Sequence, residues 1–249
     1  CMRLPVVGGN DAVVDEAAAE EMVDCAMANG VNYYDTAWGY HNGNSEIALG
    51  KALAKHPREK FYIADKFPGY DLSNMPKVQE IFEEQLKKCR VDYFDFYLFH
   101  NVCEMNIDAY LDPQYGILDY LLEQKKQGRI RHLGFSCHGN LPVLKRFLEA
   151  YGKDMEFCQL QLNYMDTNEQ AGLRGYALTE KRGVPLVIIF SIFLAHQINK
   201  KIRGRTIYRT LLFILSEMID FVFKSIFPIL LQNKESGAEC ASSRRVFIS

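Results

Sequence analysis

The first 190 residues alternate between two patterns of hydrophobic and polar positions. Short apolar segments rich in β-branched and aromatic residues are followed by longer segments whose apolar residues recur three and four positions apart. The first pattern predicts buried strands and the second predicts amphipathic helices. The predicted strands cover residues 31–37, 60–67, 91–100, 129–136, 155–164 and 184–190. The predicted helices cover residues 14–30, 45–56, 76–89, 141–152 and 169–183, and a further long helical stretch runs to Gly128.

Strands that alternate with helices indicate an α/β protein whose parallel sheet is covered on both faces. A doubly wound sheet and a β/α barrel both satisfy this pattern. A GxGxxG turn after the first strand is typical of the doubly wound fold, and no such turn is present there. Polar residues close five of the strands, namely Asp35, Lys66, His100, Ser136 and Asn163. Because chemistry at the carboxyl ends of several strands is typical of barrels, we predict a (β/α)8 TIM barrel.

The alternation stops near residue 190. The apolar segment 210–231 carries Glu217, Asp220 and Lys224 near its middle. Each such charge at a bilayer centre costs about 2.5–3.5 kcal/mol, so a helix packed on protein is favoured over a membrane span. We therefore expect two regions: a partial barrel over residues 1–190, and a divergent helical and disordered tail over residues 191–249.

Composition excludes several classes of function. The chain is 48% hydrophobic and 24% charged, which is ordinary for a globular protein, and its net charge of −2 offers no basic surface for nucleic acid. The seven cysteines occur singly, without a CxxC pair, so we expect no metal site. Dispersed cysteines and the lack of a basic-then-apolar leader favour a cytoplasmic protein.

Asp35, Lys66 and His100, together with Tyr40, lie in the segments NYYDTAWGYHNGNSEIALGKAL, FYIADKF and DFYLFH. These segments resemble motifs of the aldo-keto reductase family. The family signature is similar to NYYDTAWGYHNGNSEIALGKAL, where Asp35 ends a strand and Tyr40 follows five residues later. The segments that carry the family's lysine and histidine resemble FYIADKF and DFYLFH, which contain Lys66 and His100. The resemblance covers about residues 1–189. It implies an NAD(P)H-dependent oxidoreductase that reduces aldehyde or ketone carbonyls to alcohols, with these four residues as its catalytic tetrad.

The same resemblance implies a cofactor site for NADPH or NADH. The segments GFSCHG and CQLQLNY are similar to those that hold the nicotinamide carboxamide, here through Ser136 and Gln159. Cys137 stands where many family members have an asparagine that shares this contact. The N-terminal CMRLP resembles the end of the first barrel strand, which would place Met2 and Arg3 beside the cofactor. Since the chain starts inside that strand, we expect the barrel to be incomplete at both ends.

The chemistry of these residue types supports the same roles. A tyrosine titrates near pH 10, and a neighbouring lysine ammonium stabilises the phenolate and makes the phenol a better acid. An aspartate can balance the buried ammonium, and a neutral imidazole can orient the substrate carbonyl. The hydride must come from a nicotinamide because no side chain delivers one. Taken singly, each residue is more often structural or solvated, and only their occurrence together at matching strand ends favours an enzyme.

The resemblance ends after residue 190. The family continues with a Glu-Pro turn, a glycine-rich loop, an eighth strand and a segment that grips the adenosine 2′-phosphate, and residues 191–205 resemble none of these. We interpret residues 191–249 as a frameshift product, a genuine extension or a cover for the barrel edge. The alternative to an active enzyme is a non-catalytic barrel fragment that binds a cofactor or a partner protein. The substrate, the choice between NADPH and NADH and the oligomeric state stay open.

Overall fold

Six parallel strands form one sheet in the part of the chain that the computed structural model describes, residues 1–161 and 170–189. Their spatial order follows their order along the chain, from β1 to β6. The strands are β1 (Tyr33–Asp35), β2 (Tyr62–Phe67), β3 (Phe94–Val102), β4 (Ile130–Cys137), β5 (Phe157–Gln161) and β6 (Leu186–Ile189). A doubly wound sheet reverses its strand order at a switch point, whereas a barrel does not. The sequential order therefore confirms the predicted barrel topology over these six strands.

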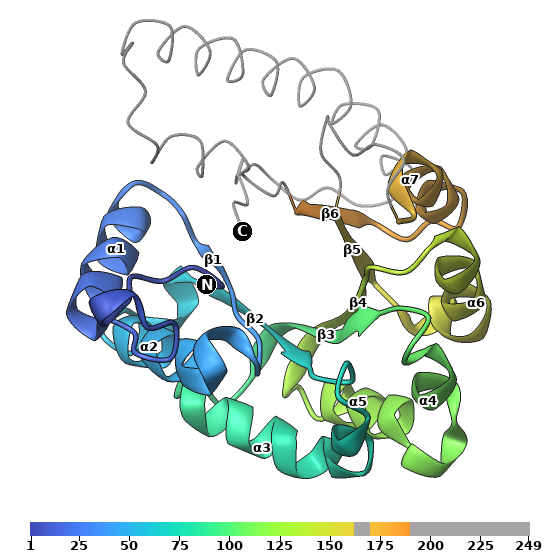
Figure 1. Cartoon of the computed structure of the whole chain (residues 1–249), viewed down its shortest axis with the longest axis horizontal. Coiled ribbons are helices and arrows are strands. Elements are labelled where there is room, and N and C mark those ends of the chain that lie inside the picture. Colours follow the sequence, from blue (N-terminus) through green and yellow to red (C-terminus); the bar gives the residue numbers. More distant parts are fainter. Residues whose placement is uncertain (162–169, 190–249) are drawn as a thin grey trace, which may run out of the picture. The chain divides into compact units, whose positions relative to one another are not determined.

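Helices join the strands along the outer side of the curved sheet (Figure 1). They are α1 (Glu16–Ala28), α2 (Asn44–Leu53), α3 (Val78–Cys89), α4 (Ile107–Leu111), α5 (Ile117–Lys126), α6 (Leu141–Tyr151) and α7 (Gly172–Lys181). Each begins or ends within a few residues of the predicted bounds, except in the stretch predicted as one long helix up to Gly128. That stretch is divided into α4 and α5 by a short 3-10 turn, Pro113–Tyr115, and by Gly116 at φ 56°. Proline has no N–H group to donate to a helical hydrogen bond, and a glycine in the left-handed conformation ends a helix, so the helix breaks there.

The N-terminal segment differs from the expectation of a barrel strand. Residues 1–5 form no strand, and the Leu4 amide donates instead to His41 Nε2 at 2.9 Å. Pro5 has no amide hydrogen to offer a neighbouring strand. Beyond it, Val6 forms an isolated antiparallel bridge with Val14. The segment is therefore held by the His41 side chain, by this hairpin-like contact and by a hydrogen bond from the Cys1 nitrogen to the Asp35 carbonyl at the end of β1, without forming a strand of its own.

Aromatic side chains fill the layer between the sheet and the helices. The rings of Phe82 in α3 and Tyr97 in β3 lie 5.1 Å apart edge to face, and those of Phe135 in β4 and Phe147 in α6 lie 4.5 Å apart. All four side chains are fully buried. Each such pair contributes about 0.5–1.5 kcal/mol beyond its burial. This packing fixes the strands whose carboxyl ends carry the polar residues.

Several expectations fall on residues outside the described ranges. They concern Asn163, the apolar segment 210–231 and the boundary between residues 190 and 191, and they remain predictions. Among the helices that are described, none is long and apolar enough to cross a membrane.

Candidate active site

A buried ion pair joins the ends of the first two strands. Lys66 Nζ lies 2.5 Å from Asp35 Oδ1 and also donates to the Thr36 carbonyl at 2.7 Å. The Lys66 side chain is 2% exposed and that of Asp35 is 9% exposed. Asp35 closes β1 and pairs in register with Ala64, so Lys66 stands two residues further along β2. The staggered strand ends thus bring the two charges together.

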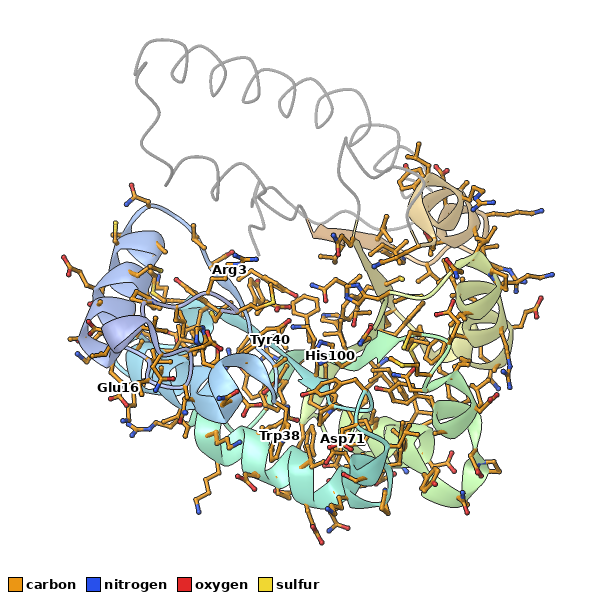
Figure 2. The ribbon with its side chains drawn as sticks, in the orientation of Figure 1. Arg3, Glu16, Trp38, Tyr40, Asp71 and His100 are labelled. Carbon is orange, nitrogen blue, oxygen red and sulfur yellow. The ribbon has the colours of Figure 1, made fainter. Side chains whose placement is uncertain are left out.

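Tyr40 follows β1 in a short 3-10 turn, Tyr40–Gly43. The Lys66 ammonium lies 5.0 Å from the centroid of the Tyr40 ring. On the other side, the Tyr40 and His100 rings meet edge to face with their centroids 6.0 Å apart. Figure 2 shows these two side chains next to each other on the inner side of the sheet. The structure therefore brings together all four residues of the predicted tetrad.

Burial and neighbouring charges compete in setting the pKa values of this group. It raises the pKa of Tyr40, and the opposing charge of Lys66 offsets only part of that rise. The sequence argument considered the lysine alone and so predicted a better acid than a buried phenol can be. For Lys66 the balance is reversed: burial acts to lower its pKa, but the charges of Asp35 and Tyr40 outweigh it and the pKa is raised. At neutral pH this gives a protonated phenol beside an ammonium.

His100 lies near the end of β3 and is neutral at neutral pH. Burial, followed by the charge of Lys66, lowers the pKa of His100 well below its usual value. Its Nδ1 is buried without a hydrogen-bond partner among the described residues. Tyr70, in the loop after β2, packs its ring edge to face against the imidazole at 5.3 Å between centroids. Sequence reasoning did not single out Tyr70, because nothing in its local pattern separates it from other loop tyrosines.

The two residues predicted to hold the nicotinamide carboxamide lie on adjacent strands. Ser136 in β4 and Gln159 in β5 are paired in register, and both are buried. The Ser136 hydroxyl accepts a hydrogen bond from the Asn101 amide at 2.8 Å, and among the described residues its own hydrogen remains available to donate. The Gln159 amide nitrogen donates to Asp35 Oδ2 at 3.3 Å, while its Oε1 is buried without a partner among the described residues.

A free acceptor beside a free hydroxyl donor suits a carboxamide, which carries both a donor and an acceptor. A buried acceptor without a hydrogen bond destabilises a folded protein. A bound carboxamide would supply that hydrogen bond, so Ser136 and Gln159 fit the predicted nicotinamide. Cys137 has no side-chain amide to offer the carboxamide, and its buried thiol donates to the Gly139 carbonyl at 3.9 Å. Met2 and Arg3 are both exposed in the N-terminal segment, and their role at the cofactor remains a prediction.

The sequence also missed a polar cluster behind Lys66. Asp65, Glu46 and Gln85 are fully buried between β2 and the helices α2 and α3. Glu46 belongs to the signature segment, but the three residues come from separate elements, so no single motif reveals the cluster. Within the described ranges, no three His, Cys, Asp or Glu side chains are arranged to hold a metal ion.

Comparison with known proteins identifies the family. The model of the aldo/keto reductase family matches residues 6–203. This chain belongs to the aldo/keto reductase family. The match begins slightly later than the resemblance seen in the sequence and extends beyond residue 189, into the part of the chain outside the described ranges.

Individual aldo/keto reductases show the extent of the similarity. A methylglyoxal reductase from Salmonella typhi is 32% identical over 155 residues, which are 61% of this chain and 55% of the relative. An NADH-specific methylglyoxal reductase from Escherichia coli K12 is 26% identical over 154 residues, 55% of this chain and 45% of the relative. The chain thus spans about half the length of these curated relatives. The holo form of an aldo-keto reductase from Bacillus halodurans superposes with a TM-score of 0.59 at 26% identity, covering 76% of this chain and 59% of the other.

Proposed function

We propose that this aldo/keto reductase chain reduces aldehyde or ketone carbonyls to alcohols with NAD(P)H, and that Tyr40 is the proton donor. The observation that carries the proposal is the placement of Tyr40 between a buried ammonium and a neutral imidazole. Lys66 is held by Asp35 at 2.5 Å and lies 5.0 Å from the Tyr40 ring, and His100 lies edge-on at 6.0 Å.

Each side chain has a defined part in proton transfer. A carbonyl oxygen bound beside Tyr40 and His100 would receive the phenolic proton as its negative charge develops. The Lys66 ammonium stabilises the phenolate that remains, and Asp35 balances the ammonium charge. The neutral imidazole of His100 orients the carbonyl through a hydrogen bond. A positioned general acid typically contributes about 10²–10⁴-fold to the rate.

A nicotinamide cofactor would supply the hydride to the carbonyl carbon. Ser136 and Gln159 would hold its carboxamide, since within the described ranges one has a hydroxyl hydrogen available to donate and the other a buried acceptor without a partner. The relative from Escherichia coli is named as NADH-specific, so NADH and NADPH both need to be assayed. Two of the relatives are named methylglyoxal reductases, which makes methylglyoxal the first substrate to test.

The test compares wild type with Tyr40→Phe and with Tyr151→Phe. Tyr151 donates to the Tyr110 carbonyl from α6, away from the tetrad, and serves as the matched loss of a phenolic hydroxyl. We expect Tyr40→Phe to abolish methylglyoxal-dependent oxidation of NAD(P)H and to retain cofactor binding, and Tyr151→Phe to retain both. Equal turnover in wild type and Tyr40→Phe would refute the role of Tyr40. Cofactor binding without turnover by wild type would instead favour a non-catalytic fragment.

A further inference from the structure

The fully buried cluster of Asp65, Glu46 and Gln85 has no part in the mechanism above. The Gln85 amide nitrogen donates to Glu46 Oε1 at 3.0 Å and to Asp65 Oδ1 at 2.9 Å, while Gln85 Oε1 accepts from the Tyr97 hydroxyl at 2.5 Å. Burying two carboxyl groups is strongly unfavourable unless their hydrogen bonds are well made. The contacts of this cluster with the main chain of Lys66 indicate its role.

The main chain of Lys66 lies beyond the end of its neighbour strand. β1 ends at Asp35 opposite Ala64, and the Thr36 amide donates to the Ala64 carbonyl at 2.9 Å. Along a strand, the amide and carbonyl of every second residue face the same neighbour. The amide and carbonyl of Lys66 therefore face the side where β1 has already ended.

Side chains of the cluster take the place of the missing strand. Asp65 Oδ1 accepts from the Lys66 amide at 2.8 Å. The Gln85 amide nitrogen donates to the Lys66 carbonyl at 3.0 Å. Both main-chain groups of Lys66 are thus satisfied by the layer between sheet and helices, directly behind the side chain that approaches Tyr40.

We propose that Asp65 and Gln85 are positioning residues for carbonyl reduction: they replace the strand partners that Lys66 lacks and so hold its ammonium between Asp35 and Tyr40. The inference rests on the proposed function and names two residues that touch neither substrate nor cofactor.

The geometry of the acceptor matters here more than its charge. Burial, and then the neighbouring charge of Glu46, raises the pKa of Asp65 well above its usual value. Burial also raises the pKa of Glu46, although Lys88 donates to its other oxygen at 3.1 Å. These effects favour the neutral form of the Asp65 carboxyl, and asparagine is a neutral side chain that keeps Oδ1.

The experiment compares Asp65→Ala with Asp65→Asn in the full chain. Asp95→Ala is the matched control, because Asp95 is a buried carboxylate on β3 that accepts from the Ile63 amide at 3.0 Å, three residues before Lys66. We expect Asp65→Ala to lower kcat for methylglyoxal about 10-fold or more with KM within about 2-fold, because the acid is mispositioned in the transition state. Asp65→Asn and Asp95→Ala should keep kcat within about 3-fold.

Three results would overturn the inference: an unchanged kcat in Asp65→Ala, an equal loss in Asp65→Asn, or an equal loss in Asp95→Ala. If Asp65→Ala does not fold, Gln85→Met replaces it, since it removes the donor to the Lys66 carbonyl at similar volume.

A second readout needs no turnover. In ¹⁵N-lysine-labelled protein, the Lys66 ammonium should give a resonance protected from exchange, assigned by its loss in Lys66→Met. It should persist in Asp65→Asn and broaden in Asp65→Ala or Gln85→Met, and persistence in both of the latter would refute the positioning role. An inactive wild type with this pattern refutes the proposed function alone, whereas an active enzyme that is indifferent to Asp65→Ala refutes the positioning role alone.

Discussion

Replacing Lys66 with methionine removes one charge of the buried pair at nearly constant volume. The wild-type ammonium lies 2.5 Å from Asp35 Oδ1 and 2.7 Å from the Thr36 carbonyl. The variant leaves the Asp35 carboxylate buried, with the Gln159 amide at 3.3 Å as a remaining donor. Asp35→Asn is the reciprocal change and leaves the ammonium with the Thr36 carbonyl.

The expected loss of stability follows from this geometry. Breaking a buried ion pair on one side costs about 3–5 kcal/mol. The Gln159 and Thr36 contacts compensate partly, so each single variant should lose about 3 kcal/mol from a total of about 5–15 kcal/mol. The double variant leaves no unpaired charge, so its loss should not exceed that of one single variant, about 3 kcal/mol. Independent losses would sum to about 6 kcal/mol, and the difference is a coupling energy of about 3 kcal/mol.

Urea titration measures these free energies of unfolding. The chain has one tryptophan, Trp38, so its fluorescence reports on one place in the fold, where Lys88 Nζ lies 3.7 Å from the centroid of the indole ring. Losses that add in the double variant, or single losses below about 1 kcal/mol, would show that the pair is screened like a surface ion pair. The description of a buried, coupled pair would then be wrong.

Two further predictions concern neighbouring groups. Gln159→Leu should weaken NADPH binding about 10-fold, because it removes the free acceptor and about 1.4 kcal/mol with it, while Gln124→Leu, the loss of a buried amide in α5, should leave the affinity unchanged in fluorescence titration. The folded-state pKa of Asp65 is raised by burial and Glu46, so its contribution to stability is present in acid and is lost as pH rises through that pKa. Asp65→Asn should therefore gain stability relative to wild type in urea titrations as pH rises from about 4. The titratable groups that also face Asp65 are Glu46, Lys66, Lys88, Cys89 and Tyr97. A difference in the free energy of unfolding between the two proteins that stays constant across pH would show that the pKa of Asp65 is not raised.

The sequence predicts the strands and their polar ends well because both signals are local. An apolar segment that closes on Asp35, Lys66 or His100 is visible in a few adjacent residues, and parallel strands bring such ends to one edge. The turn at Pro113 and Gly116 was an equally local signal, and it accounts for the divided helix.

Properties that depend on packing are beyond the reach of the pattern. The raised pKa of Tyr40 arises from burial by distant elements, which outweighs the charge of Lys66. The hydrogen bonds of Gln85 with Glu46 and Asp65 join three elements, with residues up to 39 positions apart. The pattern of residues along the chain shows neither how deeply a side chain is buried nor which distant residues it contacts.

The dependence of kcat/KM on pH, measured with methylglyoxal and NADPH, tests the role of Tyr40 most directly. Because the pKa of Tyr40 is raised above 10.0 and that of His100 is lowered well below 6.5, we predict a constant value across neutral pH and a decline only in strongly alkaline solution. A decline centred near about pH 6.5 would show that a histidine donates the proton and would contradict the assignment of Tyr40.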